Sequence, residues 1–426
     1  MSEASEQQLL KPLPPELLHD HGGNAEMRWE AMSGAGYATP NDRFYVRNHG
    51  PTPSIGVASW TLHVEGPGVS RGLSLSYEDL LALPAVSVTR ALECAGNGRI
   101  FFGEQEGREE EGTPWRLGAI GVAGWTGVPL RLLLEEAGLE ASAVEVMPEG
   151  LEEPGFARPL PLSKALEEDV VLAYLMNGEP LPPDHGYPAR LVVPGWAAMA
   201  SVKWVGRILV SDRPLLTHWN TEVYVLVGPD YAQHEGPGRG PAVKETLVNS
   251  ALELPWPAQL PEEPQEITGR AWSGAGTIAS VEYRIDGGEW RPADLRGPIS
   301  PAPCSASPLS GKQRPESTNC GCERPTLRAI SSRRACRTTS RATSTTPSSP
   351  TRLQFINRQL VHLWRPLTVR YLKRWPKFIV RACGVPPDFA TISIVRRDGF
   401  ATPGLDEVRA SIRLERQPAP YLTAKH

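Results

Sequence analysis

The sequence predicts a mostly β protein of two or three domains, and three observations support this expectation. The run from Val86 to Leu92 has the apolar and β-branched composition of a strand, and a Gly/Asn-rich turn follows it. Residues 266–290 read as a strand, a turn, an alternating strand and an Asp-Gly-Gly hairpin turn. The chain has 426 residues, of which 40% are hydrophobic, so it is long enough for two or three domains with their own cores.

Residues 1–40 are expected to form an N-terminal extension ahead of the first domain. The stretch that begins Met1-Ser-Glu-Ala-Ser-Glu has no basic region, apolar region or twin-arginine pair of an export signal. No run approaches the roughly 18 apolar residues of a membrane span. These features predict a cytoplasmic protein, and a signal removed ahead of residue 1 would instead place it in the periplasm.

A single cysteine lies where the strand-like run around residue 90 breaks into the turn. Cys94 is the only cysteine before residue 304, and Cys94-Ala-Gly-Asn-Gly-Arg99 places an arginine five residues after it. A thiol at a strand end is expected to face a cavity, and a nearby arginine favours its ionised form. Thiolates are soft ligands that select transition metals. A lone cysteine is more often a small buried apolar residue, so the motif leaves both alternatives open.

Further short motifs in one order along the chain favour a metal-binding role for this cysteine. Together they resemble the molybdenum domain of the sulfite oxidase family. The resemblance implies an α+β fold, with a mostly β molybdopterin-binding domain over residues 41–252. A truncated immunoglobulin-like β-sandwich dimerisation domain is expected to follow, with its start at residues 260–296. The matching segments are Phe44–His49, Cys94–Arg99, Trp115–Ile120 with Trp125–Leu130, Leu172–Gly178, His185–Gly195 and Ser201–Val205.

The resemblance also implies a cofactor and a site. Its molybdenum would be held by the dithiolene of molybdopterin, with the Cys94 thiolate as the one protein ligand. The cofactor phosphate needs cationic and hydrogen-bonding partners, and an oxyanion substrate needs a cationic pocket. The family's cofactor-binding positions correspond here to Arg47, Asn48, His49, Cys94, His185, Arg190, Ser201 and Lys203. Its substrate pocket corresponds to Arg47, Arg99, Trp115 and Tyr224.

The activity that the resemblance implies is oxygen-atom transfer to sulfite or a related small sulfur oxyanion. No haem-binding domain is visible before Phe44 and no Cys-x-x-Cys-His motif occurs, so electrons are expected to pass to a separate acceptor such as a c-type cytochrome. Thr277 follows the Trp272-Ser-Gly-Ala-Gly turn where sulfite-oxidising relatives have an arginine. Gly98 replaces an arginine of the animal enzymes, which brings the motif closer to bacterial sulfite- or sulfane-oxidising branches.

The charge of the chain changes sharply near its last quarter. Residues 1–323 hold 24 Lys and Arg against 43 Asp and Glu, whereas residues 324–426 hold 20 against 5. Ser, Thr, Pro and Arg dominate residues 331–350, a composition that does not bury enough apolar surface to fold. We therefore interpret 297–352 as a low-complexity segment, produced by a shifted reading frame near residue 297. A natural disordered basic tail is the alternative.

Residues 353–426 form a basic tail that is expected to be disordered, and the sequence otherwise leaves its nature open. Between residues 353 and 381, Arg and Lys alternate with Trp, Tyr and Phe, which suits nucleic-acid or membrane-surface binding. Most basic runs are solvated surfaces, so no nucleic-acid partner is expected. A homodimer is expected if the second domain is intact. The alternative is a protein that binds its cofactor without turnover because that domain is damaged.

Overall fold

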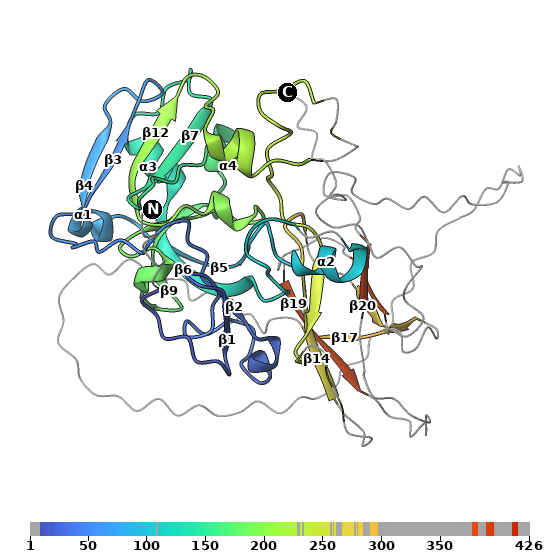
Figure 1. Cartoon of the computed structure of the whole chain (residues 1–426). Coiled ribbons are helices and arrows are strands. Elements are labelled where there is room, and N and C mark those ends of the chain that lie inside the picture. Colours follow the sequence, from blue (N-terminus) through green and yellow to red (C-terminus); the bar gives the residue numbers. More distant parts are fainter. Residues whose placement is uncertain are drawn as a thin grey trace, which may run out of the picture. The chain divides into compact units, whose positions relative to one another are not determined.

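The computed structural model describes residues 9–107, 110–227, 231, 234–255, 258, 260, 266–276, 278, 280–283 and 290–296, together with three strands within 377–415. These residues are mostly β, as the sequence predicts, and their helices are short (Figure 1). In this part of the chain no helix is both long and apolar enough to cross a bilayer. The helices are α1 (Tyr77–Ala82), α2 (Ile100–Glu106), α3 (Leu130–Glu136), α4 (Leu162–Ala165), the 3-10 helices η1 (Trp29–Met32), η2 (Pro183–His185) and η3 (Ala198–Ala200), and the π-helix η4 (Trp219–Val223).

The first sheet is built on two apolar strands. The strands β6 (Ile120–Pro129) and β9 (Val171–Met176) lie next to each other and are mostly buried, because each is a nearly continuous apolar run. Outside them lie β5 (Val86–Glu93) on one side and β10 (Glu179–Pro180) on the other, and β11 (Arg190–Val192) also pairs with β9. All of these pairings are antiparallel. The β5 strand ends one residue before Cys94.

The second sheet has five strands, of which β3 and β12 pair in parallel. In Figure 1, β3, β12 and β7 lie side by side beside α3. Both sheets contribute to one hydrophobic core, into which α3 inserts leucines at the i, i+3 and i+4 spacing of a helix face. The strand order is β4 (Leu73–Ser76), β3 (Thr61–Glu65), β12 (Val205–Ser211), β7 (Glu145–Gly150) and β8 (Leu160–Pro161).

The segment predicted as an N-terminal extension packs onto these sheets. It contains the two-stranded ribbon of β1 (Leu18–Asp20) and β2 (Ala25–Met27). Closer to the N-terminus, the backbone amides of Leu10 and Lys11 donate to the carboxylate of Asp184 at 2.9 and 2.7 Å. Residues 9–40 of this extension therefore pack against the first domain.

Two four-stranded sheets follow the first domain. The predicted boundary at residue 252 coincides with the end of β13, which pairs with β14 of the following part. Strands β18, β19 and β20 come from residues 353–426, where the sequence predicts a disordered tail. For the rest of that tail, disorder stays a prediction. Residues 297–352 lie outside the described residues. The sheets are β13 (Asn249–Leu252), β14 (Glu266–Trp272), β19 (Phe389–Val395) and β17 (Asp294–Arg296), and β16 (Arg291–Pro292), β15 (Ser280–Tyr283), β18 (Lys377–Arg381) and β20 (Ser411–Glu415).

The β14 strand contacts the N-terminal segment directly. The ring of Trp29 stacks on Trp272, with centroids 5.7 Å apart and an interplanar angle of 15°. The guanidinium of the buried Arg270 donates to the carbonyls of Gly36 and Tyr37. These contacts close a small hydrophobic core around residues from both parts of the chain.

Candidate functional site

Cys94 is held by a tight turn that follows β5. The Asn97 amide donates to the Cys94 carbonyl at 3.0 Å, and the Cys94 amide donates to the Ala119 carbonyl at 2.8 Å. The Asn97 side chain donates to the Glu93 carboxylate and accepts from the Ala119 amide. Gly98 has a φ of +84°, in the left-handed region that glycine adopts without strain. The turn therefore fixes the thiol in place, and Cys94 is 8% exposed.

A cavity beside Cys94 gathers most of the predicted site residues. Its empty volume, including the open solvent at its mouth, is about 660 Å³. The predicted residues that line it are Arg47, Asn48, His49, Cys94, His185, Arg190, Ser201, Lys203 and Tyr224.

A chain of hydrogen bonds crosses one wall of the cavity. Arg47 Nη2 lies 3.1 Å from His49 Nδ1, and His49 Nε2 lies 2.7 Å from the Tyr224 hydroxyl. Because a guanidinium only donates, Nδ1 accepts, and the proton of the neutral ring lies on Nε2. Burial, with the nearby charges of Arg47 and Lys203, lowers the pKa of His49 to about 3 and keeps it neutral at neutral pH. The Tyr224 oxygen thus accepts from His49, and its own proton can be donated into the cavity.

Two cations, the buried Arg190 and the part-buried Lys203, also line the cavity. Arg190 donates to the carbonyls of His185 and Ser201 at 3.1 and 3.0 Å, and Lys203 donates to the carbonyl of Asp184 at 2.9 Å. Burial lowers the pKa of Arg190 to about 10 and holds the pKa of Lys203 well below its usual value. Removing a cation from water is costly unless a partner compensates it, so an anion bound between these groups would be strongly favoured.

Three polar atoms of the cavity lack a hydrogen-bond partner within the described part of the chain. They are Nε of Arg190, Nε2 of His185 and Oε2 of Glu152. Burial holds the pKa of His185 well below its usual value and raises the pKa of Glu152 to about 7. Each buried polar group without a partner costs about 1–3 kcal/mol. The cavity therefore has the properties of a site for a polar, negatively charged ligand.

Comparisons with known proteins agree with this geometry. The family described as the oxidoreductase molybdopterin binding domain matches residues 49–219. Mitochondrial sulfite oxidase of Mus musculus is 38% identical over 289 residues, covering 64% of this chain and 52% of that protein. Sulfite oxidase of Gallus gallus is 38% identical over 285 residues, covering 62% of this chain and 60% of that protein. The crystal structure of the sulfane dehydrogenase SoxCD from Paracoccus pantotrophus is 30% identical with a TM-score of 0.59, covering 70% of this chain and 77% of that one. The chain belongs to the sulfite oxidase family. It spans about half the length of the mammalian sulfite oxidases that it matches.

The molybdenum cofactor of the sulfite oxidase family fits the donor set of this cavity. The unpartnered nitrogens of Arg190 and His185 and the ammonium of Lys203 suit an anionic group such as the pterin phosphate. Across the described residues, no group of three or more His, Cys, Asp or Glu could hold a metal ion. The Cys94 thiol lines the same cavity, and a single protein thiol suits a metal whose other ligands come from the cofactor.

Two of the predicted site residues do not line the cavity. Trp115 is fully buried behind Tyr45, with ring centroids 6.5 Å apart. The Arg99 guanidinium donates to the Thr113 carbonyl at 2.6 Å and lies against Gly96 in the turn after Cys94. Both side chains therefore support the Cys94 turn and its surroundings. Thr277, the position of the missing family arginine, lies outside the described residues.

Sequence reasoning missed several cavity residues. Glu152 and Asp184 contribute carboxylates, and Tyr45, Met199 and Trp204 contribute apolar and aromatic surface. The Lys203 ammonium lies 3.9 Å from the centroid of the Trp204 ring, a cation–π contact. The only sequence signal for Asp184 and Trp204 is that each directly adjoins a predicted residue, His185 or Lys203. Glu152 has no such signal.

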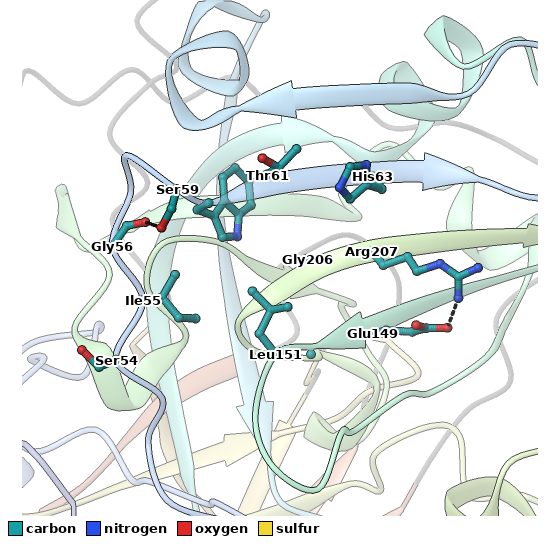
Figure 2. Close-up of a pocket in the computed structure, with 12 residues that line it drawn as sticks. Ser54, Ile55, Gly56, Ser59, Thr61, His63, Glu149, Leu151, Gly206 and Arg207 are labelled. Atoms are coloured by element: carbon teal, nitrogen blue, oxygen red, sulfur yellow. Dashed lines mark hydrogen bonds and ion pairs between the residues drawn. The ribbon is translucent and has the colours of Figure 1, made fainter.

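A second, more open hollow lies between β3, β7 and β12 and is lined by none of the predicted residues (Figure 2). Its charged side chains already have partners. Arg207 pairs with Glu65 at 2.6 Å and with Glu149 at 2.9 Å, and the Ser59 hydroxyl donates to the Gly56 carbonyl. None of the buried, unpartnered polar atoms of the described residues belongs to this hollow, in contrast to the cavity beside Cys94.

Proposed function

We propose that this protein is a molybdenum-cofactor-dependent oxidoreductase that oxidises sulfite or a related small sulfur oxyanion. The observation that carries the proposal is one cavity that combines the Cys94 thiol, two cations and the Arg47–His49–Tyr224 chain. Sulfite oxidases and a sulfane dehydrogenase are among the proteins that this chain resembles. When bound, the cofactor would supply two-electron redox chemistry with oxygen-atom transfer.

Arg190, His185 and Lys203, with Asn48 and Ser201, are proposed to hold the cofactor. The first three offer cationic or unpartnered nitrogens, which form strong hydrogen bonds with a phosphate. Arg190 is already oriented, because two carbonyls fix its Nη atoms while Nε stays unbonded. Cys94 is proposed as the protein ligand of the metal.

Tyr224, Arg47 and His49 are proposed to bind the anionic substrate. His49 donates to the Tyr224 oxygen, so the phenol proton can be donated to a substrate oxygen. Burial raises the pKa of Tyr224 to about 12, which keeps this proton in place at neutral pH. Arg47 is the charged member of the chain, and Arg99 is proposed to add positive charge from behind the Cys94 turn.

The remaining proposals concern partners. Electrons are proposed to pass to a separate acceptor such as a c-type cytochrome. Residues 260–296 are proposed to start an immunoglobulin-like domain, and the two sheets around β14 and β15 favour this architecture. If that domain is complete, a homodimer is expected, and if it is damaged, we expect a protein that binds cofactor with little turnover.

An assay with the purified, cofactor-loaded protein tests the proposed function. Molybdenum per chain is measured together with sulfite-dependent reduction of cytochrome c or ferricyanide. We expect about one molybdenum per chain and saturable sulfite oxidation. Thiosulfate and nitrate serve as comparison substrates in the same assay. Full molybdenum content without activity on sulfite or thiosulfate would contradict the substrate class and favour the impaired-enzyme alternative.

A further inference from the structure

Arg158 is a buried arginine near the cavity that the proposed chemistry does not yet use. It lies just before β8 and is 1% exposed. Its Nη1 donates to the Trp219 carbonyl at 2.8 Å and its Nη2 donates to the Val243 carbonyl at 2.6 Å. Its Nε has no hydrogen-bond partner, and within the described residues no carboxylate forms an ion pair with this guanidinium. A buried arginine without a counterion is unusual, because each such charge carries a desolvation cost.

Both carbonyls that Arg158 binds belong to the backbone that fixes Tyr224. The Tyr224 amide donates to the same Trp219 carbonyl at 3.0 Å, at the end of η4. The Val243 amide donates to the Tyr224 carbonyl at 2.9 Å. The guanidinium therefore joins the segment from Trp219 to Tyr224 to the segment around Val243 that hydrogen-bonds Tyr224.

The electrostatic environment adds a second link between the same residues. Arg158 is one of three arginines whose charge lowers the pKa of Tyr224 against the larger opposing effect of burial. Burial lowers the pKa of Arg158 itself to about 10, so its guanidinium remains charged at neutral pH. Its positive charge thus lies behind the phenol that faces the cavity.

We propose that Arg158 is a positioning residue of the anion pocket, which holds Tyr224 against His49 and places an uncompensated positive charge behind them. The part that concerns substrate rests on the proposed function. The cost of burying the charge is then offset when an anion occupies the cavity, because a desolvated cation attracts it more strongly than a solvated one.

Arg158→Met and Arg158→Lys test this proposal in the cofactor-loaded protein. The methionine removes both hydrogen bonds and the charge, whereas the lysine keeps the charge and at most part of the bonding. At equal molybdenum content, we expect Arg158→Met to raise the KM for sulfite about tenfold with kcat within threefold of the wild-type value. Arg158→Lys should recover part of this loss. In a Tyr224→Phe background, the effect of Arg158→Met on KM should fall below threefold.

Two measurements do not depend on turnover and separate this proposal from the proposed function. Calorimetric titration with sulfate should show about tenfold weaker binding in Arg158→Met. Backbone amides of residues 219–226 should exchange hydrogen about tenfold faster in the same variant. If the wild-type protein does not oxidise sulfite, the proposed function fails, and these two measurements still decide the role of Arg158.

Arg270→Lys is the control, because Arg270 is also a buried arginine that donates to two backbone carbonyls, but it pairs with Glu253 at 2.6 Å and does not line the cavity. It should change thermal stability and leave sulfite KM and sulfate affinity unchanged. Faster exchange in Arg158→Met with wild-type KM and wild-type sulfate affinity would make Arg158 purely structural and overturn the proposal. Unchanged exchange would overturn the positioning of Tyr224. If Arg158→Met does not fold, the same outcomes are judged on Arg158→Lys.

Discussion

Asp184 connects three segments of the chain, and its replacement should destabilise the cavity as a whole. Its carboxylate accepts hydrogen bonds from the backbone amides of Leu10 and Lys11 and from the Thr52 hydroxyl. The residue is 1% exposed. Asp184→Ala leaves all three donors without an acceptor, while Asp184→Asn keeps one acceptor oxygen and should cost about half as much.

The expected magnitude follows from the burial of each donor. Leu10 is 56% exposed, so water can replace its lost partner, and its amide contributes little. The Lys11 amide and the Thr52 hydroxyl are part-buried donors, each costing about 1–3 kcal/mol when left unpaired. We therefore expect Asp184→Ala to lower the free energy of unfolding by about 3 kcal/mol. For a domain of this size that corresponds to a fall in Tm of roughly 6–12 °C, measured by calorimetry.

Asp169→Ala is the control for this experiment. Asp169 pairs with Arg90 at 2.9 Å, but both side chains are about a quarter exposed, so the pair should contribute at most about 1 kcal/mol. If the two alanine variants have the same Tm within error, hydrogen bonds to Asp184 do not anchor the N-terminal segment. That result would refute the reasoning.

Three further outcomes are expected. Cys94→Ser should keep the fold and abolish the thiolate-to-metal absorption band, and an unchanged spectrum would exclude Cys94 as the ligand. Lys203→Met should lower molybdenum content per chain about tenfold or more, because a charged hydrogen bond to phosphate contributes roughly 1.5–3 kcal/mol; full occupancy would remove Lys203 from the site. Burial lowers the pKa of Lys11 to about 8, against about 10.4 in an unfolded chain, so the folded protein binds fewer protons between these values. Lys11 should therefore contribute a rise of about 2–3 kcal/mol in the free energy of unfolding in urea from pH 8 to pH 10, and the rise should be smaller by that amount in Lys11→Met.

Local features of the fold could be predicted from the sequence because they depend on neighbouring residues. The strand that ends at Glu93 and the turn around Gly98 follow from composition and from the conformational freedom of glycine. The set of cavity residues depended on resemblance, since chemistry alone does not distinguish Arg190 or Lys203 from a surface cation. Arg99 lies close to Cys94 in the sequence, but the turn directs its side chain to the Thr113 carbonyl rather than into the cavity lining. Closeness in sequence therefore did not predict where this side chain lies.

Features that depend on distant segments could not be predicted. In the sequence, nothing distinguishes Asp184 from an exposed acidic residue, because the backbone amides that bind its carboxylate lie 173 and 174 residues away along the chain. Glu152 is charged in the sequence, and only its burial in the cavity makes it exceptional. In the tail, net charge averaged over many residues hides the short apolar stretch Phe389–Val395, which pairs with β14 along its whole length. Composition describes long segments well and single strands poorly.

The docking of the N-terminal segment onto Asp184 affects how this protein can be divided into fragments. The family match spans residues 49–219, which retains Cys94, Arg190 and Lys203. A fragment with those boundaries would lack Arg47 and Asn48 at one end and Tyr224 at the other, and would leave the Asp184 carboxylate without its two amide donors. A fragment that keeps these contacts and the bond from Arg158 to the Val243 carbonyl begins no later than Leu10 and continues past Val243, well beyond the borders that sequence similarity marks as the domain.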